Sequence, residues 1–411
     1  MSAQPQPIVV WGVTASPYML KMQSLLDYWL HDQPGSWQRW PEQASMLRAL
    51  STARALQRAK QRGEVARFPA RDPELDEYPA VPFYTLDGSQ FFYDSSGLAL
   101  HLDQLGEGRA PGFVPREPAL AFLCHLIDEA FDEFGLYMVH HMRWVGSART
   151  TQMGHRTARQ LRAPPGLRGL LARRLYHRQV RRCPYLFSVA PEGYVAGVAA
   201  RRTPPARAGF PATHALLESA WHEYLAAMEQ LLQERPFILG DRFTLADASA
   251  YGQLGMNLDD PEAADLLQAT APRTFDWLRA IAAGRHGTSE GALSGSPALQ
   301  RLLDAICATF VPLMQQNTAA YERERRAGQT VFNEAAFDRG IALYDGDLMG
   351  HPFRAVVKTF QVQVWRDLQA RWSALSPAQR ASLEVDYGLP AAALTRRNEH
   401  ARTTPVAISG G

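Results

Sequence analysis

The chain has 411 residues, of which 46% are hydrophobic and 20% charged, which is typical of a globular protein with more than one domain. The net charge is +2, no apolar run approaches the roughly 20 residues of a membrane span, and the first residues do not resemble a signal peptide. Cys124, Cys183 and Cys307 lie far apart without metal-type spacing, so we expect reduced thiols in a cytoplasmic protein.

The first hundred residues alternate between short apolar runs and stretches with helical spacing. Two β-type runs around Asp87-Gly88 are a hairpin signal. In chain order we expect a strand at 8–12, a helix from Pro17, a strand at 37–40, a helix at 47–62, a hairpin at 81–86 and 90–93, and a helix at 98–105. This order is that of a thioredoxin-like α/β domain, which we place at residues 1–110.

The rest of the chain has helical periodicity, interrupted by segments rich in Gly, Pro and Arg. We expect an all-α domain at 115–284 with a first long helix at 119–144, an Arg-rich insertion at about 147–212, a helical extension at 297–395 with long helices at 297–325 and 353–375, and a disordered tail at 396–411.

The segment from Pro236 to Asp247, Pro-Phe-Ile-Leu-Gly-Asp-Arg-Phe-Thr-Leu-Ala-Asp, marks a helix start. Thr244 and Asp247 stand at the spacing of a capping box, in which each side chain accepts from the other's backbone N–H. An apolar-rich helical stretch precedes the segment and another follows it. This order resembles the capped core helix in the all-helical domain of glutathione transferases; an ordinary capped helix in an unrelated protein is the alternative.

The resemblance implies a glutathione site that begins at Ala15-Ser16-Pro17-Tyr18. This junction between the first strand and helix looks like the Ser-Pro-Phe/Tyr opening of serine-type transferases. The Ser16 hydroxyl would hydrogen-bond the glutathione sulfur beside the positive end of the helix and favour the thiolate. Tyr18 is the substitute hydroxyl donor, and simple capping of the helix by Ser16 is the alternative.

Two further motifs would hold the rest of glutathione. Val81-Pro82 stands where the family carries a cis-proline, and Val81 would pair with the cysteinyl part like an added strand. At the next helix start, Ser95 would hold the γ-glutamyl carboxylate and Asp94 the ammonium group, unless the pair is only an N-cap. The ligand for the glycyl end cannot be chosen among Arg54, Arg58, Lys60 and Arg62.

The second substrate would lie between the domains, against the helix at 119–144. Tyr137, His141 and Trp144 lie on one face of that helix, with core packing as the alternative. His140-His141 has no carboxylate or cysteine at ligand spacing, so we expect no metal.

The basic residues are strongly biased toward arginine. Only Lys21, Lys60 and Lys358 are lysine among 43 basic residues, as a GC-rich genome would produce. Residues 134–191 contain arginines and histidines but no acidic residue. Because this window lacks a nucleic-acid motif and regularly spaced aromatics, we interpret it as a solvated helical insertion, and expect no nucleic-acid or membrane partner. Some of its arginines would attract an anionic substrate such as glutathione.

The resemblance therefore implies a bacterial glutathione transferase-like enzyme of detoxification. It would use glutathione as co-substrate, activate its thiol for attack on a hydrophobic electrophile, and form a homodimer. The alternatives are a non-catalytic binding or scaffold protein on the same fold, like the metaxin relatives, and a basic anion-binding adaptor.

Overall fold

The N-terminal domain is built on a five-stranded sheet. The computed structural model describes residues 7–33, 35–77, 81–106, 112–147, 151–194, 206–287 and 290–395, so the expected tail at 396–411 lies outside the described residues. The sheet has the order β2-β1-β4-β5-β3, with β1 parallel to β2 and antiparallel to β4. Its elements are β1 (Ile8–Trp11), α1 (Pro17–Trp29), β2 (Trp37–Trp40), α2 (Met46–Arg62), β3 (Ala66–Arg67), β4 (Phe83–Thr85), β5 (Phe92–Tyr93) and α3 (Ser95–Leu105).

The predicted order of strands and helices is confirmed, with one addition at the sheet edge. The strand β3 pairs in parallel with β5 and was not predicted. It contains only two residues, and two residues carry no alternation of polar and apolar side chains. The thioredoxin-like assignment of this domain holds.

The helical domain follows, and its first predicted helix is almost continuous. Two π-helical turns interrupt the predicted helix at 119–144. The elements are α4 (Pro118–Ala130), η1 (Phe131–Gly135), α5 (Leu136–His141), η2 (Met142–Gly146), α8 (His214–Glu234), α9 (Leu245–Leu254), η5 (Gly255–Asp259), α10 (Pro261–Thr270) and α11 (Pro272–Ala282). The insertion contributes α6 (Met153–Gln160), η3 (Pro165–Leu167) and α7 (Arg168–Arg182).

The C-terminal extension is not purely helical, which corrects the prediction. It comprises η6 (Pro297–Leu299), α12 (Gln300–Ala308), α13 (Phe310–Arg326), α14 (Asn333–Arg339), β6 (Leu343–Leu348), β7 (His351–Val356), α15 (Thr359–Ala374), α16 (Pro377–Tyr387) and α17 (Ala391–Leu394). The predicted helix at 353–375 begins only at Thr359. Phe353 and Val356 instead belong to strand β7 of an antiparallel hairpin, and their side chains are buried in the core. The predicted helix at 297–325 breaks at Thr309, since Pro312 has no N–H with which to continue α12.

The domains share one core rather than meeting at a wet interface. Helix α1 packs on α9, and a Cβ on Gly252 would lie 2.8 Å from the Lys21 Cβ, so only glycine allows this close crossing. The capping box is confirmed: Thr244 and Asp247 each accept from the other's backbone N–H, and both are fully buried. The core extends from the sheet to the C-terminal extension.

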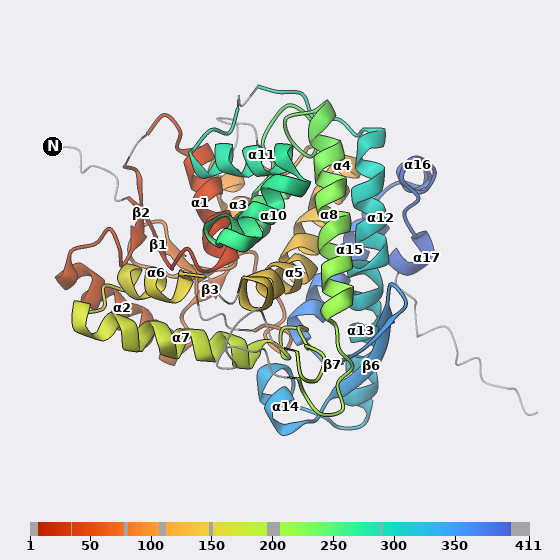
Figure 1. The fold of residues 1–411 in the computed structure, drawn as a ribbon. Coiled ribbons are helices and arrows are strands. Elements are labelled where there is room, and N and C mark those ends of the chain that lie inside the picture. Colours follow the sequence, from red (N-terminus) through yellow and green to blue (C-terminus); the bar gives the residue numbers. More distant parts are fainter. Residues whose placement is uncertain are drawn as a thin grey trace, which may run out of the picture.

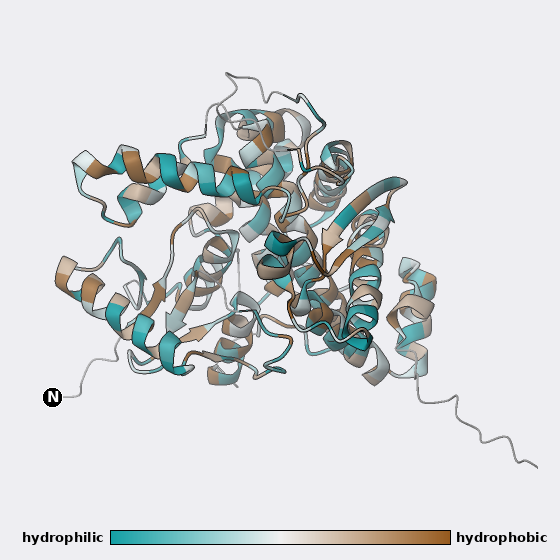
Figure 2. Ribbon diagram, turned by 90° about the horizontal axis from the view of Figure 1, so that it is seen from below, coloured by the Kyte–Doolittle hydropathy of each residue, from teal (hydrophilic) through white to brown (hydrophobic). Residues whose placement is uncertain are grey.

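The sheet lies at one end of the molecule with α2 and α7, and α16 and α17 lie at the opposite end (Figure 1). Hydrophobic and hydrophilic stretches alternate along the helices, as expected of helices that pack on one face (Figure 2). None of the described helices is long and apolar enough to cross a bilayer.

Candidate functional site

A cavity of about 410 Å³ opens where the sheet domain, the helical domain, the insertion and the extension meet. The sequence-predicted residues that line it are Tyr18, Val81, Pro82, Asp94, Ser95 and Tyr137. The Val81–Pro82 peptide bond is cis, as predicted. The structure thus brings together all four residues predicted to bind glutathione, although they come from two separate motifs.

The start of α3 forms one wall of the cavity. The carboxylate of Asp94 accepts from the N–H groups of Ser96 and Gly97 and forms an ion pair with Arg67. Burial alone would raise the pKa of Asp94, but Arg67 and other nearby cations lower it below its usual range. The Ser95 hydroxyl has no hydrogen-bond partner among the described residues. A ligand at this helix start would therefore meet a free serine hydroxyl beside an already paired aspartate.

Ser16 lies at the N-cap of α1, where its side chain makes no capping hydrogen bond. Its loop is held from outside the sheet domain: Gln160 of α6 accepts from Thr14 N at 2.9 Å, and Arg143 of η2 donates to the Ala15 carbonyl at 3.4 Å. Ser16 is not among the residues that line the cavity. The structure therefore leaves its hydroxyl outside the cavity lining and unused by the helix.

Tyr18 lines the cavity, but its hydroxyl already donates to the Asp132 carbonyl at 3.0 Å. Burial, reinforced by the charges of Glu133 and Asp132, raises its pKa well above the usual value. Tyr18 therefore remains a neutral phenol with its proton engaged.

Lys21 links the two domains beneath this site. Its ammonium group donates to Ser96 Oγ at 2.7 Å and to carboxylate oxygens of Asp128 and Asp132, both at 2.6 Å. Burial alone would lower the pKa of Lys21, but the two carboxylates raise it on balance. The three donors of a lysine match these three oxygens, so its charge is fully neutralised inside the protein.

The extension contributes an opposite wall that the sequence did not predict. Lys358, Phe360 and Gln361 all line the cavity. The Lys358 ammonium donates to the Tyr137 hydroxyl at 2.6 Å and lies over the rings of Tyr137 and Tyr185, 4.4 and 4.6 Å from their centres. Burial lowers its pKa to about 8, and Glu77 and Glu133 limit the fall.

The position of Lys358 is fixed by its backbone. Asn317 of α13 accepts from the Lys358 N–H and donates to its carbonyl, both at 2.9 Å. Gln361 donates to the same Tyr137 hydroxyl at 2.8 Å. The extension therefore presents a lysine to the cavity from a rigid support rather than from a free chain end.

The cavity is unusually rich in carboxyl groups for a site expected to hold an apolar electrophile. Burial raises the pKa of Asp132 and of Glu133, each to about 7, and that of Glu129 above its usual range. Arg178 and Arg182 of α7 and Arg67 of β3 supply positive charge. The lining therefore suits a ligand that carries several charges and hydrogen-bonding groups.

The predicted second-substrate residues are not brought together. Tyr137 lines the cavity, but Trp144 packs with Met153, Tyr176 and other insertion side chains in an apolar cluster that Ala15 also contacts. His141 points instead toward the start of α8, where it contacts His214. Among the described residues, the three share a helix but not a pocket.

Sequence reasoning missed the basic residues that line the cavity. None of the candidates for the glycyl end, Arg54, Arg58, Lys60 and Arg62, is among the lining residues. Arg178 and Arg182 belong to the acid-free window, and the rarity of lysine could have drawn attention to Lys358. Arg67 carried no signal, because it lies in a two-residue strand.

Residues 211–305 match the family model described as the glutathione S-transferase C-terminal domain. This match confirms the predicted resemblance to the glutathione transferase superfamily. No curated protein matches the chain.

The chain is also similar to solved glutathione S-transferase structures. One from Pseudomonas fluorescens Pf-5 is 15% identical, with a TM-score of 0.31, and the match covers 69% of this chain and 98% of that one. One from Ceriporiopsis subvermispora, in complex with glutathione, is 16% identical, with a TM-score of 0.39 and coverage of 69% and 99%. Another from Pseudomonas fluorescens Pf-5, with two glutathione molecules bound, is 14% identical, with a TM-score of 0.31 and coverage of 70% and 96%.

Proposed function

We propose that the cavity binds glutathione and that the protein is a glutathione transferase-like enzyme. The observation that carries this proposal is the meeting of Val81, Pro82, Asp94 and Ser95 in one cavity of about 410 Å³. Glutathione has two carboxylates, an ammonium group and two amides, which matches a lining with both signs of charge. Ser95 would hold the γ-glutamyl carboxylate, and the Val81 backbone would pair with the cysteinyl unit.

Ser16 would activate the thiol from the edge of this site. Its hydroxyl is not used to cap α1, so it remains available as a donor to sulfur. Lowering a thiol pKa from about 8.5 by about two units would make most of the thiol ionised at neutral pH and favour the thiolate by about 2.7 kcal/mol. Ala15, next to Ser16, packs against an apolar cluster that contains Trp144, and an apolar electrophile would bind on this side of the site.

A non-catalytic binding protein on the same fold is the second candidate. Two observations favour it: Ser16 does not line the cavity, and side chains of the extension occupy its outer wall. In that case the cavity would retain glutathione or a similar charged molecule without transferring its sulfur.

Calorimetric titration with glutathione, together with a thiol-conjugation assay, separates the two candidates. The enzyme proposal predicts binding, conjugation of an aryl halide, and loss of at least about tenfold in rate in Ser16→Ala. Ser51→Ala, a change of the same kind on exposed α2, is the matched control. Binding without conjugation, unchanged in Ser16→Ala, supports the binding protein. Absence of binding at millimolar glutathione contradicts the enzyme proposal and leaves the binding-protein candidate only with a different charged ligand.

Homodimerisation belongs to the same proposal and rests on the resemblance alone. Light scattering coupled to size-exclusion chromatography would show about twice the chain mass of 45.8 kDa for a dimer. A monomer that still binds glutathione would show that the site is complete within one chain.

A further inference from the structure

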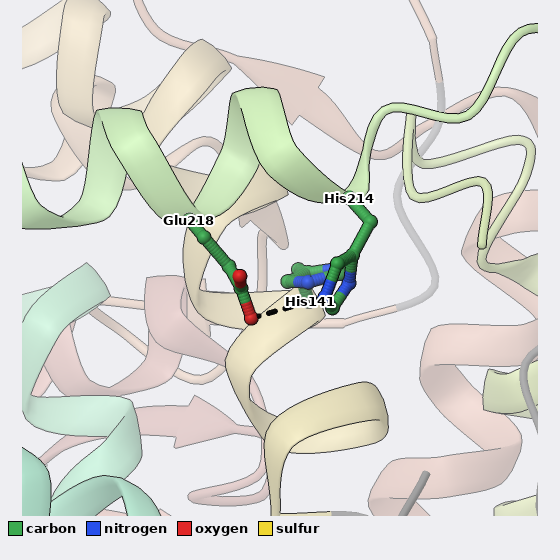
Figure 3. A group of neighbouring side chains, drawn as sticks. All are labelled: His141, His214 and Glu218. Atoms are coloured by element: carbon green, nitrogen blue, oxygen red, sulfur yellow. Dashed lines mark ion pairs between the residues drawn. The ribbon is translucent and has the colours of Figure 1, made fainter. Parts of the chain in front are cut away.

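We propose that His141, His214 and Glu218 form a zinc-binding site that ties α5 to the first turn of α8. These side chains point toward one another from the two helices (Figure 3). One ligand atom from each residue lies within 4.8 Å of the others. None of the three lines the cavity, so the proposal does not depend on the proposed function.

Half of the proposed coordination sphere is already at the required spacing. His214 Nε2 and Glu218 Oε1 are 3.1 Å apart, one helical turn from each other on α8. Zinc–ligand bonds of about 2.0–2.1 Å in a tetrahedron place neighbouring ligand atoms about 3.3 Å apart. Only the distances from the His141 ring nitrogen to the other two ligand atoms, which are within 4.8 Å, must shorten. The Glu218 side chain is 48% exposed and therefore has room to move.

The buried histidine presents an unused nitrogen to this point. His141 is 1% exposed, and its Nε2 has no hydrogen-bond partner among the described residues. A buried polar atom without a partner costs about 1–3 kcal/mol, a cost that coordination of a metal would remove.

The surroundings of His141 favour the form that binds metals. Its Nδ1 lies 2.8 Å from Ser188 Oγ. The Ser188 hydroxyl also hydrogen-bonds the Cys183 thiol, whose own proton goes to the Gln179 carbonyl. If the Ser188 proton points to the sulfur, Ser188 accepts from the Nδ1–H of His141, and Nε2 is left with a lone pair.

The carboxylate that the local sequence around His140-His141 lacks is thus supplied by α8. Two imidazoles and one carboxylate are ligands that zinc accepts, with the fourth position taken by water. The sequence expectation of no metal considered only neighbours along the chain, whereas Glu218 lies 77 positions after His141. A metal here would fix α5, the helix that carries Tyr137 into the cavity.

Equilibrium dialysis of the chelator-treated full chain against zinc chloride tests the proposal. We expect one zinc ion per chain in the wild type. In His214→Gln and in Glu218→Gln the dissociation constant for zinc should be at least tenfold larger. These two residues are partly exposed, so their variants should fold even if a His141 variant does not. His222→Gln, at an exposed position two turns along α8, is the matched control and should bind like the wild type.

A second readout separates this site from loose binding to surface histidines. Zinc should raise the melting temperature of the wild type and of His222→Gln, because it binds only the folded state, and should not raise that of His214→Gln. Cobalt bound in the wild type should give the visible absorption of tetrahedral coordination. No zinc uptake, or equal uptake in all variants, overturns the proposal.

Discussion

Two buried lysines face different surroundings in this molecule. Lys21, at the junction of the sheet and helical domains, has three oxygen partners at 2.6–2.7 Å, two of them carboxylates, and its pKa is raised. Lys358, in the wall of the cavity, donates to a neutral phenol and lies over two aromatic rings, and its pKa is lowered to about 8.

The difference shows which buried charge belongs to the framework and which is available to a ligand. A lysine surrounded by carboxylates has its charge matched inside the protein and has nothing left to offer. Lys358 donates to a phenol and lies over two aromatic rings; Glu77 and Glu133 act on it electrostatically, but no carboxylate accepts a hydrogen bond from its ammonium among the described residues, and an anion entering the cavity would supply such a partner. Burial alone does not distinguish the two cases; the identity of the partner atoms does.

The largest effect should come from Lys21→Met. Removing the cation leaves Asp128 and Asp132 buried side by side without a counter-charge, which should lower the free energy of unfolding by about 3–5 kcal/mol. Urea unfolding followed by circular dichroism measures it. Lys60→Met is the control: its ammonium lies over the Phe83 ring without joining this network, and the cost should stay within about 1 kcal/mol. If Lys21→Met and Lys60→Met lower the free energy of unfolding equally, the ion pairs of Lys21 do not stabilise the fold as argued.

Asp247→Ala tests a buried charge that is held by hydrogen bonds rather than by a cation. Its carboxylate accepts from the backbone of Ile238 at 2.8 Å and of Thr244 at 2.9 Å. Loss of the capping box leaves these N–H groups unpaired and should cost about 2–3 kcal/mol in the same urea experiment. Asp265→Ala, on the exposed side of α10, should change the free energy by no more than about 0.5 kcal/mol.

Lys358→Met should cost far less than Lys21→Met at about pH 7, within about 1 kcal/mol, or should stabilise the fold. The folded pKa of about 8 lies below the ordinary 10.5, so the unfolded chain binds this proton more tightly. Between these values the wild type should gain stability relative to the variant as pH rises. Unfolding of both proteins at about pH 7 and about pH 9.5 measures the trend. If the wild type instead loses stability relative to Lys358→Met over this interval, the pKa of Lys358 is not lowered in the folded protein, and the contrast with Lys21 is wrong.

Most of the helices and strands could be predicted from the sequence, because they are specified by residues close together in the chain. The helix start at Pro17, the hairpin around Asp87-Gly88 and the capping box of Thr244 and Asp247 each depend on residues a few positions apart. The cis bond before Pro82 was implied by the family resemblance rather than by its neighbours in the sequence. Such features could be predicted, and the structure confirms them.

The cavity could be predicted only on one side. Val81, Pro82, Asp94 and Ser95 belong to motifs, whereas Lys358 reaches Tyr137 across 221 positions of sequence, and no local pattern records that contact. The hairpin β6–β7 is a different case: its register pairs Gly346 with Phe353 around the two-residue turn Met349-Gly350, and the positive φ angles of both turn residues are a local feature that could have been predicted. Long-range packing, not local propensity, decided the wall of the cavity that the extension supplies.

The central claim is that the start of α3 and the cis-proline segment form a glutathione site. Calorimetric titration with S-methylglutathione, which cannot react through sulfur, tests it on the wild type, Ser95→Ala and the control Ser89→Ala. Ser89 lies on the exposed turn between β4 and β5. The account predicts saturable binding to the wild type and to Ser89→Ala, and about tenfold weaker binding to Ser95→Ala, which lacks the hydroxyl that faces the ligand carboxylate. Equal affinity in all three proteins, or no binding at millimolar ligand, would contradict it.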